Sequence, residues 1–207
     1  MRILFNSYAN RYDSWYRRNK LAYLSELRAL KKVLPKNGKG LEIGVGTGRF
    51  AAPLGIEYGI DPSPNMLKIA QSRGVNVHLG FGEDIPFPNK SFEYVAIIIT
   101  LCFVKNPTKV IEEAKRIIKK NGRIIIGIVD KETFLGKFYQ RKKSAFYKQA
   151  KLFSVKEVVD LLKQAGFVSF AYYQTISVLP ERMSLIETPR KGFGRAGFVV
   201  ISALKHK

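Results

Sequence analysis

The sequence Leu41-Glu42-Ile43-Gly44-Val45-Gly46-Thr47-Gly48 places a short apolar strand directly before three closely spaced glycines. Glycine lets the backbone turn sharply and lets a bound molecule approach without a Cβ in the way. Open α/β sheets bind ligands at the carboxyl ends of their strands. Asp61 follows Gly44 by 17 residues, at the end of the next expected strand, where an acid can accept hydrogen bonds from two ribose hydroxyls. The turn and the acid together indicate a cofactor that contains adenosine.

The spacing of these glycines distinguishes between adenosine cofactors. The dinucleotide pattern is G-x-G-x-x-G, with a pyrophosphate at the helix N-terminus, whereas this chain reads G-x-G-x-G. Glu42 precedes the first glycine by two residues, and its charge is unfavourable beside a pyrophosphate but suits an ammonium or a sulfonium. The spacing therefore disfavours a nicotinamide-dependent oxidoreductase. Tight packing of a strand on a helix, without any ligand, is the alternative explanation of the turn.

Strand and helix patterns alternate along the chain. Leucines at spacings of three and four predict helix within residues 7–34, which Pro35 ends. The expected strands are 41–45, 58–60, 75–79, 92–99, 123–129, 167–174 and 198–204, and the expected helices further along are 63–72, 108–120 and 154–165. No helix separates the last two strands, so we expect them to pair antiparallel. This pattern predicts an α/β fold with a doubly wound, mostly parallel seven-stranded sheet and an antiparallel edge strand.

Length and composition limit the other possibilities. The chain of 207 residues suits a single domain, 1–207, in which 1–34 forms an N-terminal helical cap and 131–153 an insertion. With one cysteine and two histidines we expect no disulfide and no Cys/His metal site. We find no apolar run long enough for a membrane span and no signal-peptide core, and we expect a cytoplasmic protein.

Six stretches agree in order and spacing with one known family. They are 8–16, 41–48, 59–67, 80–87, 91–95 and 118–123. Together they make the chain resemble the class I, Rossmann-like methyltransferases that use S-adenosylmethionine, in particular the group with menaquinone-type and other small-molecule enzymes. The resemblance implies in-line transfer of a methyl group to an N, O or C nucleophile of a small molecule.

The resemblance also implies roles for matching residues. Gly44 and Gly46 would line the methionine and ribose, with Glu42 near the methionyl ammonium and Asp61 on the ribose hydroxyls. The remaining cofactor contacts would be Tyr12, Val45, Pro62, Met66, Gly82, Glu83, Ile98 and Ile99. Met66 would cover one face of the adenine, and ordinary helix packing is the alternative. Tyr12 and Tyr16 would lie in the cap over the cofactor, or only pack their helix.

Two positions depart from the family pattern. Phe81 stands where an aspartate often reaches the adenine amine, so Glu83, a main-chain carbonyl or stacking by Phe81 must substitute. Cys102 and Phe103 stand where relatives often carry two histidines, so a histidine base is absent there. If a base is needed, Asp13 and Tyr16 are the candidates, although Asp13 could equally cap a helix. No pattern indicates a reactive thiol, and we expect Cys102 to be inert.

The charge bears on the methyl acceptor. Lysine and arginine number 36 against 16 acids, a net charge of +20, which attracts polyanions but also occurs as plain solvated charge. Residues 134–156 contain no acid and interleave lysines with aromatic residues, which suits RNA or a small acidic substrate. Because no RNA-binding module and no base-amine motif are recognisable, a small molecule is favoured over RNA. A non-catalytic S-adenosylmethionine-binding protein is the alternative from another class.

Overall fold

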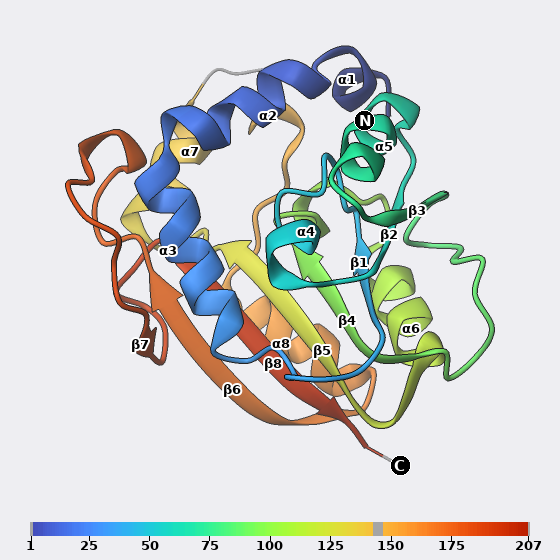
Figure 1. Ribbon diagram of the computed structural model, residues 1–207. Coiled ribbons are helices and arrows are strands. Elements are labelled where there is room, and N and C mark those ends of the chain that lie inside the picture. The colour runs from blue at the N-terminus through green and yellow to red at the C-terminus, as the bar shows by residue number, and fades with distance from the viewer. Residues whose placement is uncertain (1, 143–146, 207) are drawn as a thin grey trace.

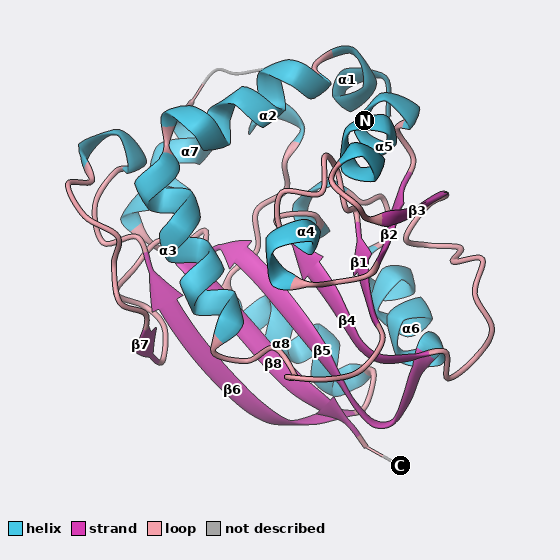
Figure 2. Ribbon diagram, viewed as in Figure 1, coloured by secondary structure: helices cyan, strands magenta, loops and turns pink. Residues whose placement is uncertain are grey.

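The computed structural model describes residues 2–142 and 147–206, which form one sheet of eight strands flanked by helices (Figure 1, Figure 2). The strands are β1 (Gly40–Ile43), β2 (Tyr58–Asp61), β3 (Asn76–Leu79), β4 (Phe92–Ile98), β5 (Ile118–Val129), β6 (Phe167–Thr175), β7 (Arg190–Lys191) and β8 (Phe198–Lys205). The helices are α1 (Arg2–Ser7), α2 (Ala9–Arg18), α3 (Lys20–Lys31), α4 (Ala51–Leu54), α5 (Pro64–Ser72), α6 (Pro107–Ile117), α7 (Phe134–Arg141) and α8 (Val155–Gln164).

The strand order is β3-β2-β1-β4-β5-β8-β6-β7. The five strands from β3 to β5 pair in parallel, and β8 pairs antiparallel with both β5 and β6. The predicted fold class, a mostly parallel sheet with antiparallel pairing toward one edge, is confirmed. The predicted count of seven strands is wrong, because the two-residue strand β7 pairs with β6 and is too short to leave a period in the sequence.

Two hydrophobic cores cover the two faces of the sheet. One core packs α6 and α8 against residues such as Leu41 and Ile43 of β1. The other packs the cap helices together with α4, α5 and α7 against the opposite face, which includes Ile98 and Ile125. Successive side chains of a strand point to opposite faces. Glu42, between Leu41 and Ile43, therefore points toward the face that the cap covers.

Several helix limits differ from the sequence prediction. The N-terminal helical segment is three helices, broken at Tyr8 and Asn19. Helix α6 ends at Ile117, three residues before the predicted end, because Ile118 already pairs with Phe92 in the sheet. The predicted start of α8 is confirmed: Ser154 and Glu157 form its capping box.

The cap crosses the carboxyl ends of the parallel strands. In Figure 1, α2 arches above the arrowheads of β1, β4 and β5, and α3 descends along the face of the sheet beside β6. Helix α7, within the insertion 131–153, lies on the far side of this arch. Among the described residues, no helix has the length and apolarity to cross a membrane. This arrangement leaves the functional side chains between the sheet edge and the cap.

Candidate active site

The glycine turn after β1 forms the base of the site. Gly44 and Gly46 have φ angles of 70° and 51°, in the left-handed region that favours glycine. A Cβ on Gly44 would lie 2.2 Å from the side chain of Thr100, so protein packing already requires glycine there. A Cβ on Gly46 would meet only the Tyr12 ring, at 3.7 Å. Gly46, rather than Gly44, therefore leaves its Cα face open to a ligand.

Asp61 lies at the end of β2, directly beside this turn. Its Oδ2 accepts a hydrogen bond from the amide of Gly46 at 3.0 Å, and its Oδ1 accepts one from the amide of Ser63 at 2.9 Å. Burial raises the pKa of Asp61 to about 6, while the two amide bonds act in the opposite direction. Each carboxylate oxygen has a further lone pair. The carboxylate is therefore held in one orientation and can still accept from two hydroxyls.

Glu42 contributes a second buried carboxyl group to the turn. It is 1% exposed, and its Oε2 has no hydrogen-bond partner among the described residues. Burial raises the pKa of Glu42 well above its ordinary value, although the amide of Ala51 donates to it. A buried, unpartnered oxygen is costly unless a ligand supplies the donor. The ammonium of a methionyl group is such a donor, so these residues fit S-adenosylmethionine.

The loop after β3 holds the residues predicted at the adenine edge. Glu83 Oε1 accepts from the amides of Lys105 at 2.9 Å and Asn106 at 3.3 Å, so this carboxylate secures the loop before α6. Phe81 is half-exposed. Gly82 is packed against Ile43, where a Cβ would lie at 2.8 Å. Glu83 is thus occupied by two amides, and the other substitutes for the missing aspartate, a main-chain carbonyl or stacking by Phe81, stay predictions.

The other predicted cofactor residues differ in what they offer. Val45 is buried and its side chain packs on Gly59, so only its backbone faces the turn. Met66 is buried on α5, one turn after the cap residue Ser63, whose hydroxyl accepts from the Met66 amide at 3.4 Å. Pro62 follows Asp61, and Ile98 ends β4 as a buried residue. These four assignments stay predictions.

Asp13, one of the two candidate bases, is fully engaged by other side chains. Arg49 and Arg73 each donate to both of its carboxylate oxygens, at 2.5–3.0 Å, and the Thr47 hydroxyl donates at 2.8 Å. These partners hold the pKa of Asp13 well below its ordinary value despite burial. Asp13 lies inside α2 and caps no helix. The geometry gives it an anchoring role, joining α2 to the glycine turn and to the end of α5.

Tyr12 and Tyr16 belong to the cap, and the Tyr12 ring lies against Gly46 of the glycine turn. They are one helical turn apart on α2, and their hydroxyl oxygens are 2.7 Å apart. Burial raises the pKa of both phenols above their ordinary value. Both are therefore neutral at physiological pH, which makes Tyr16 a hydrogen-bonding group and a poor base.

This tyrosine pair lines a cavity of about 240 Å³. Its lining comes from α2 and α3, from the segment after β4, and from the insertion 131–153, of which residues 143–146 lie outside the described residues. The apolar and aromatic residues of its wall include Tyr12, Trp15, Tyr16, Ile99, Phe103 and Tyr139. Because Ile99 directly follows β4, the cavity opens at the carboxyl end of the central strand.

Cys102 lines the cavity, but its thiol is not activated. Burial raises the pKa of Cys102 to about 12, and its Sγ lies 3.8 Å from the carbonyl oxygen of Ile99. A thiolate is the reactive form of cysteine. The thiol therefore acts as a small apolar part of the wall.

Glu26, on α3, is a cavity residue that the sequence analysis missed. It is 3% exposed, and its Oε2 has no hydrogen-bond partner among the described residues. Burial alone raises the pKa of Glu26 to about 8. A signal was present: Glu26 shares a helical face with Ala22 and Leu30, both fully buried, at spacings of four. An acid within an apolar stripe indicates a buried carboxylate.

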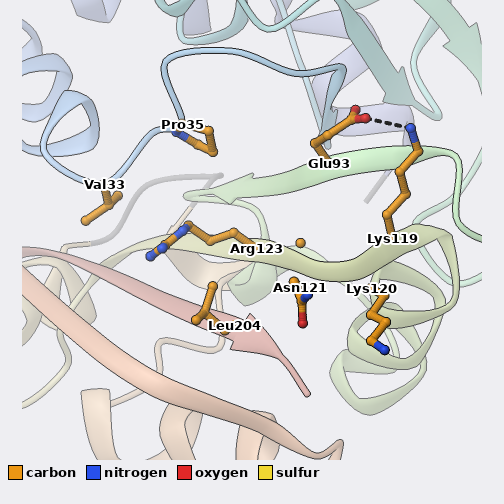
Figure 3. A pocket seen from close by; sticks show the side chains of 9 residues that line it. Val33, Pro35, Glu93, Lys119, Lys120, Asn121, Arg123 and Leu204 are labelled. Atoms are coloured by element: carbon orange, nitrogen blue, oxygen red, sulfur yellow. Dashed lines mark hydrogen bonds and ion pairs between the residues drawn. The ribbon is translucent and has the colours of Figure 1, made fainter. Parts of the chain in front are cut away.

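Figure 3 shows a second hollow, of about 380 Å³, at the opposite edge of the sheet, where the strands begin. Its walls carry Glu93, which pairs with Lys119 and accepts from the amide of Lys39 at 2.7 Å. The Glu93 carboxylate therefore already has an ion pair and a hydrogen bond within the protein. Among the described residues, no cluster of three or more His, Cys, Asp or Glu could hold a metal ion. The unpartnered acids of the described residues therefore lie elsewhere, at Glu42 and Glu26.

Comparison with known proteins agrees with this geometry. A family described as "methyltransferase domain" matches residues 41–126. An uncharacterised protein of Methanocaldococcus jannaschii is 48% identical over 98% of each chain. A crystal structure from Thermotoga maritima, described as an S-adenosylmethionine-dependent methyltransferase and possible histamine N-methyltransferase, has a TM-score of 0.96 at 46% identity and covers 99% of both chains. The chain belongs to the class I S-adenosylmethionine-dependent methyltransferases.

A relative of known acceptor is more distant from this methyltransferase. The demethylmenaquinone methyltransferase of Tropheryma whipplei is 35% identical over 141 residues, which are 61% of this chain and 57% of that protein. The resemblance to the group with menaquinone-type enzymes is thereby confirmed. Membership of the family makes this protein an enzyme, so the alternative of a non-catalytic binding protein is set aside.

Proposed function

We propose that this methyltransferase transfers the methyl group of S-adenosylmethionine to a small molecule bound in the cavity beneath the cap. One observation carries the proposal: the Tyr12 ring lies against Gly46 of the glycine turn and, together with Tyr16, lines the cavity. A ligand in the cavity thus lies next to a cofactor on the turn. Two of the relatives, the possible histamine N-methyltransferase and the demethylmenaquinone methyltransferase, have names that state small acceptors, which supports a small-molecule acceptor here.

The cofactor is held by groups that the protein has already oriented. The Asp61 carboxylate, fixed by two amides, would accept from the ribose hydroxyls, and Glu42 would receive the methionyl ammonium. Gly46 would let the ligand approach the backbone, and the exposed Phe81 would stack on the adenine. The predicted contacts at Met66 and Ile98 belong to this same proposal.

The residues of this chain would act by positioning and by excluding water. When bound, the cofactor supplies a methyl group on a sulfonium, which an acceptor displaces in line. Ile99 and the aromatic walls give that displacement an apolar environment, and alignment of the reactants supplies much of the rate. Because Asp13 is paired with arginines and Tyr16 is neutral, neither would remove a proton from the acceptor.

RNA is the second candidate acceptor, on the observation that cations surround the mouth of the cavity. Arg11, Arg18 and Lys142 line it and are exposed. If RNA is the acceptor, its affinity must fall steeply as the salt concentration rises, because neutralising phosphates releases counterions. A titration of labelled RNA between 50 and 200 mM salt, a range over which phosphate-dependent binding weakens by about 10³–10⁵, decides this. A flat response excludes the RNA candidate.

The first test of the proposal is calorimetric titration with S-adenosylhomocysteine, with NADH as the control ligand. We expect only the first to bind. Asp61→Ala removes charge-assisted hydrogen bonds to ribose, so the affinity should fall by about 1.5–3 kcal/mol. Asp160→Ala, on the exposed face of α8, is the matched control. Unchanged affinity of the Asp61 variant would remove Asp61 from the cofactor site.

A further inference from the structure

We propose that Glu26 is the residue that selects the methyl acceptor, and that it does so by pairing with an ammonium group of a small amine bound in the cavity. The inference rests on the proposed function, since it concerns the acceptor side of the same site. The proposed acceptor is an organic amine, and Glu26 lies outside the stretches that match the family.

The Glu26 carboxylate is isolated within the protein. The side chain is 3% exposed and lines the cavity, and its Oε2 has no hydrogen-bond partner among the described residues. An ionised carboxylate that is removed from bulk solvent and has no counter-charge is strongly unfavourable. An ammonium in the cavity would supply both the donor and the charge.

Glu26 lies apart from the acid that would hold the cofactor. Glu42, the other buried acid with an unpartnered oxygen, lies on β1 beside the glycine turn and does not line the cavity. Tyr12 and Tyr16 are close enough to feel the charge of both acids, and both tyrosines line the cavity. If Glu42 receives the methionyl ammonium of the cofactor, Glu26 can pair with the ammonium of a second molecule in the cavity.

The wall of the cavity is aromatic beside Glu26. Trp15, Tyr16 and Tyr139 line the same cavity as Glu26. Aromatic faces attract cations, and the attraction grows when both partners are shielded from water. Such a wall accepts the apolar body of an arylalkylamine while the carboxylate receives its charged end.

The cations of the cavity do not neutralise Glu26. Arg11 and Arg18 are exposed, and Arg18 donates to the Ser14 hydroxyl at 2.9 Å. Lys142 pairs with Glu181 at 3.8 Å and is 41% exposed. Water screens these rim charges, whereas the charge of Glu26 lies in a region of low dielectric constant. The rim cations therefore leave Glu26 without a counter-charge, and a cation that enters the cavity would favour the ionised form of Glu26.

Tryptophan fluorescence tests the inference directly, because Trp15 is the one tryptophan of the sequence and lines the cavity. The protein, saturated with S-adenosylhomocysteine, is titrated with three compounds of similar shape: phenethylamine, phenethyl alcohol and phenylacetate. We expect saturable binding of the amine and at least tenfold weaker binding of the other two, since a hydrogen bond to a charged group accounts for about tenfold or more in affinity. Preference for phenylacetate or equal binding of all three overturns the inference.

Glu26→Gln keeps the shape of the side chain and removes its charge. We expect this variant to bind phenethylamine about tenfold to a hundredfold more weakly, with unchanged affinity for S-adenosylhomocysteine. Glu112→Gln, on the exposed face of α6, is the matched control and should bind like the wild type. Equal amine affinity of the Glu26 variant overturns the inference.

The two proposals fail in different ways. If the wild type does not bind S-adenosylhomocysteine, the proposed function fails. If it binds the cofactor product but shows no preference for the amine, only the assignment of Glu26 fails. Circular dichroism of the Glu26 variant, together with its retained cofactor affinity, shows that a loss of amine binding does not come from unfolding.

Discussion

The two long helices of the cap each bury a carboxylate, and the two carboxylates lie in opposite environments. On α2, Asp13 receives hydrogen bonds from Arg49, Arg73 and Thr47, and its pKa is lowered. On α3, Glu26 has an oxygen with no partner among the described residues, and burial raises its pKa to about 8. The acid on α2 therefore has counter-charges within the protein, whereas the acid on α3 has none among the described residues.

This difference separates anchoring from binding. The Asp13 cluster joins α2 to the glycine turn and to α5, so it fixes the position of the cap over the cofactor region. The Glu26 region holds an acid without a counter-charge, so ionisation of Glu26 costs stability in the protein alone. A residue that costs stability yet lines a cavity is the type of residue expected at a functional site. Substitutions of Glu26, Asp13 and Tyr16 alter these groups one at a time.

The largest effect is expected from Glu26→Gln at high pH. With its pKa raised from 4.5 to about 8, the folded protein retains a proton that the unfolded chain releases, so stability falls as the pH rises through this window. At pH 9 the variant should be more stable than the wild type by up to about 5 kcal/mol. At pH 4 the difference should largely vanish. Urea denaturation at both pH values measures it, and parallel pH profiles would contradict the isolation of Glu26.

Asp13→Ala should have the next largest effect, in the opposite direction. It leaves two partly buried arginines without their counter-charge, and we expect a loss of about 3 kcal/mol in the free energy of unfolding. Because the pKa of Asp13 is lowered on folding, its contribution is present above the ordinary value of 3.8 and is lost as the pH falls below it. The difference in the free energy of unfolding between variant and wild type should therefore become smaller at low pH.

Urea denaturation at pH 7 and pH 3 measures the effect of Asp13→Ala, with Asp160→Ala as the exposed control. If Asp13 instead acts as a base, methyl transfer would be lost while stability stayed the same.

Tyr16→Phe tests the tyrosine pair that lines the cavity. It removes the hydrogen bond between the hydroxyls of Tyr12 and Tyr16, and the expected loss of stability is about 1 kcal/mol. Since burial keeps Tyr16 neutral, the pH profile of methyl transfer should keep its shape. If the variant's rate no longer falls on one side of the pH optimum where that of the wild type does, Tyr16 acts as an acid or a base in the reaction. Thermal denaturation and initial rates across pH 6–9, about the range in which a catalytic group titrates, give both readouts.

Cys102→Ser should have the smallest effect. Burial raises the pKa of the thiol to about 12, so no thiolate is present to act as a nucleophile. We expect turnover to stay within about twofold of the wild type, because the change in side-chain volume is small. Assays of the variant beside the wild type measure this. Abolished turnover in a folded variant would show that the thiol takes part in the reaction.

Much of the fold and of the cofactor side was predictable because its signals are local. The capping box of α8 and the glycine turn after β1 each lie within a few consecutive residues. Asp61 was recognisable because it ends the strand beside that turn, and adjacent parallel strands end at the same edge. The two-residue strand β7 was missed because it is defined only by its pairing with β6.

The acceptor side escaped prediction because its parts are distant in the sequence. Glu26 is a candidate functional residue because it lines a cavity. The walls of this cavity include residues of α2, α3, the segment after β4 and the insertion. Asp13 looked equally suited to catalysis until folding brought Arg49 and Arg73 to it, 36 and 60 residues away. The short sequence windows around Asp13 and Glu26 contain nothing that separates an anchored carboxylate from an isolated one.

The sequence by itself determined the fold class, the glycine turn and the acid beside it, since backbone conformation and strand order depend on local residue types and their spacing. The tertiary structure decided which carboxylates are paired with arginines, where a cavity remains, and which tyrosines line it. The physical reason is that pairing and desolvation depend on which groups folding brings within a few ångströms of one another. Local patterns predict where the chain turns, and packing alone determines which charges stay without a partner.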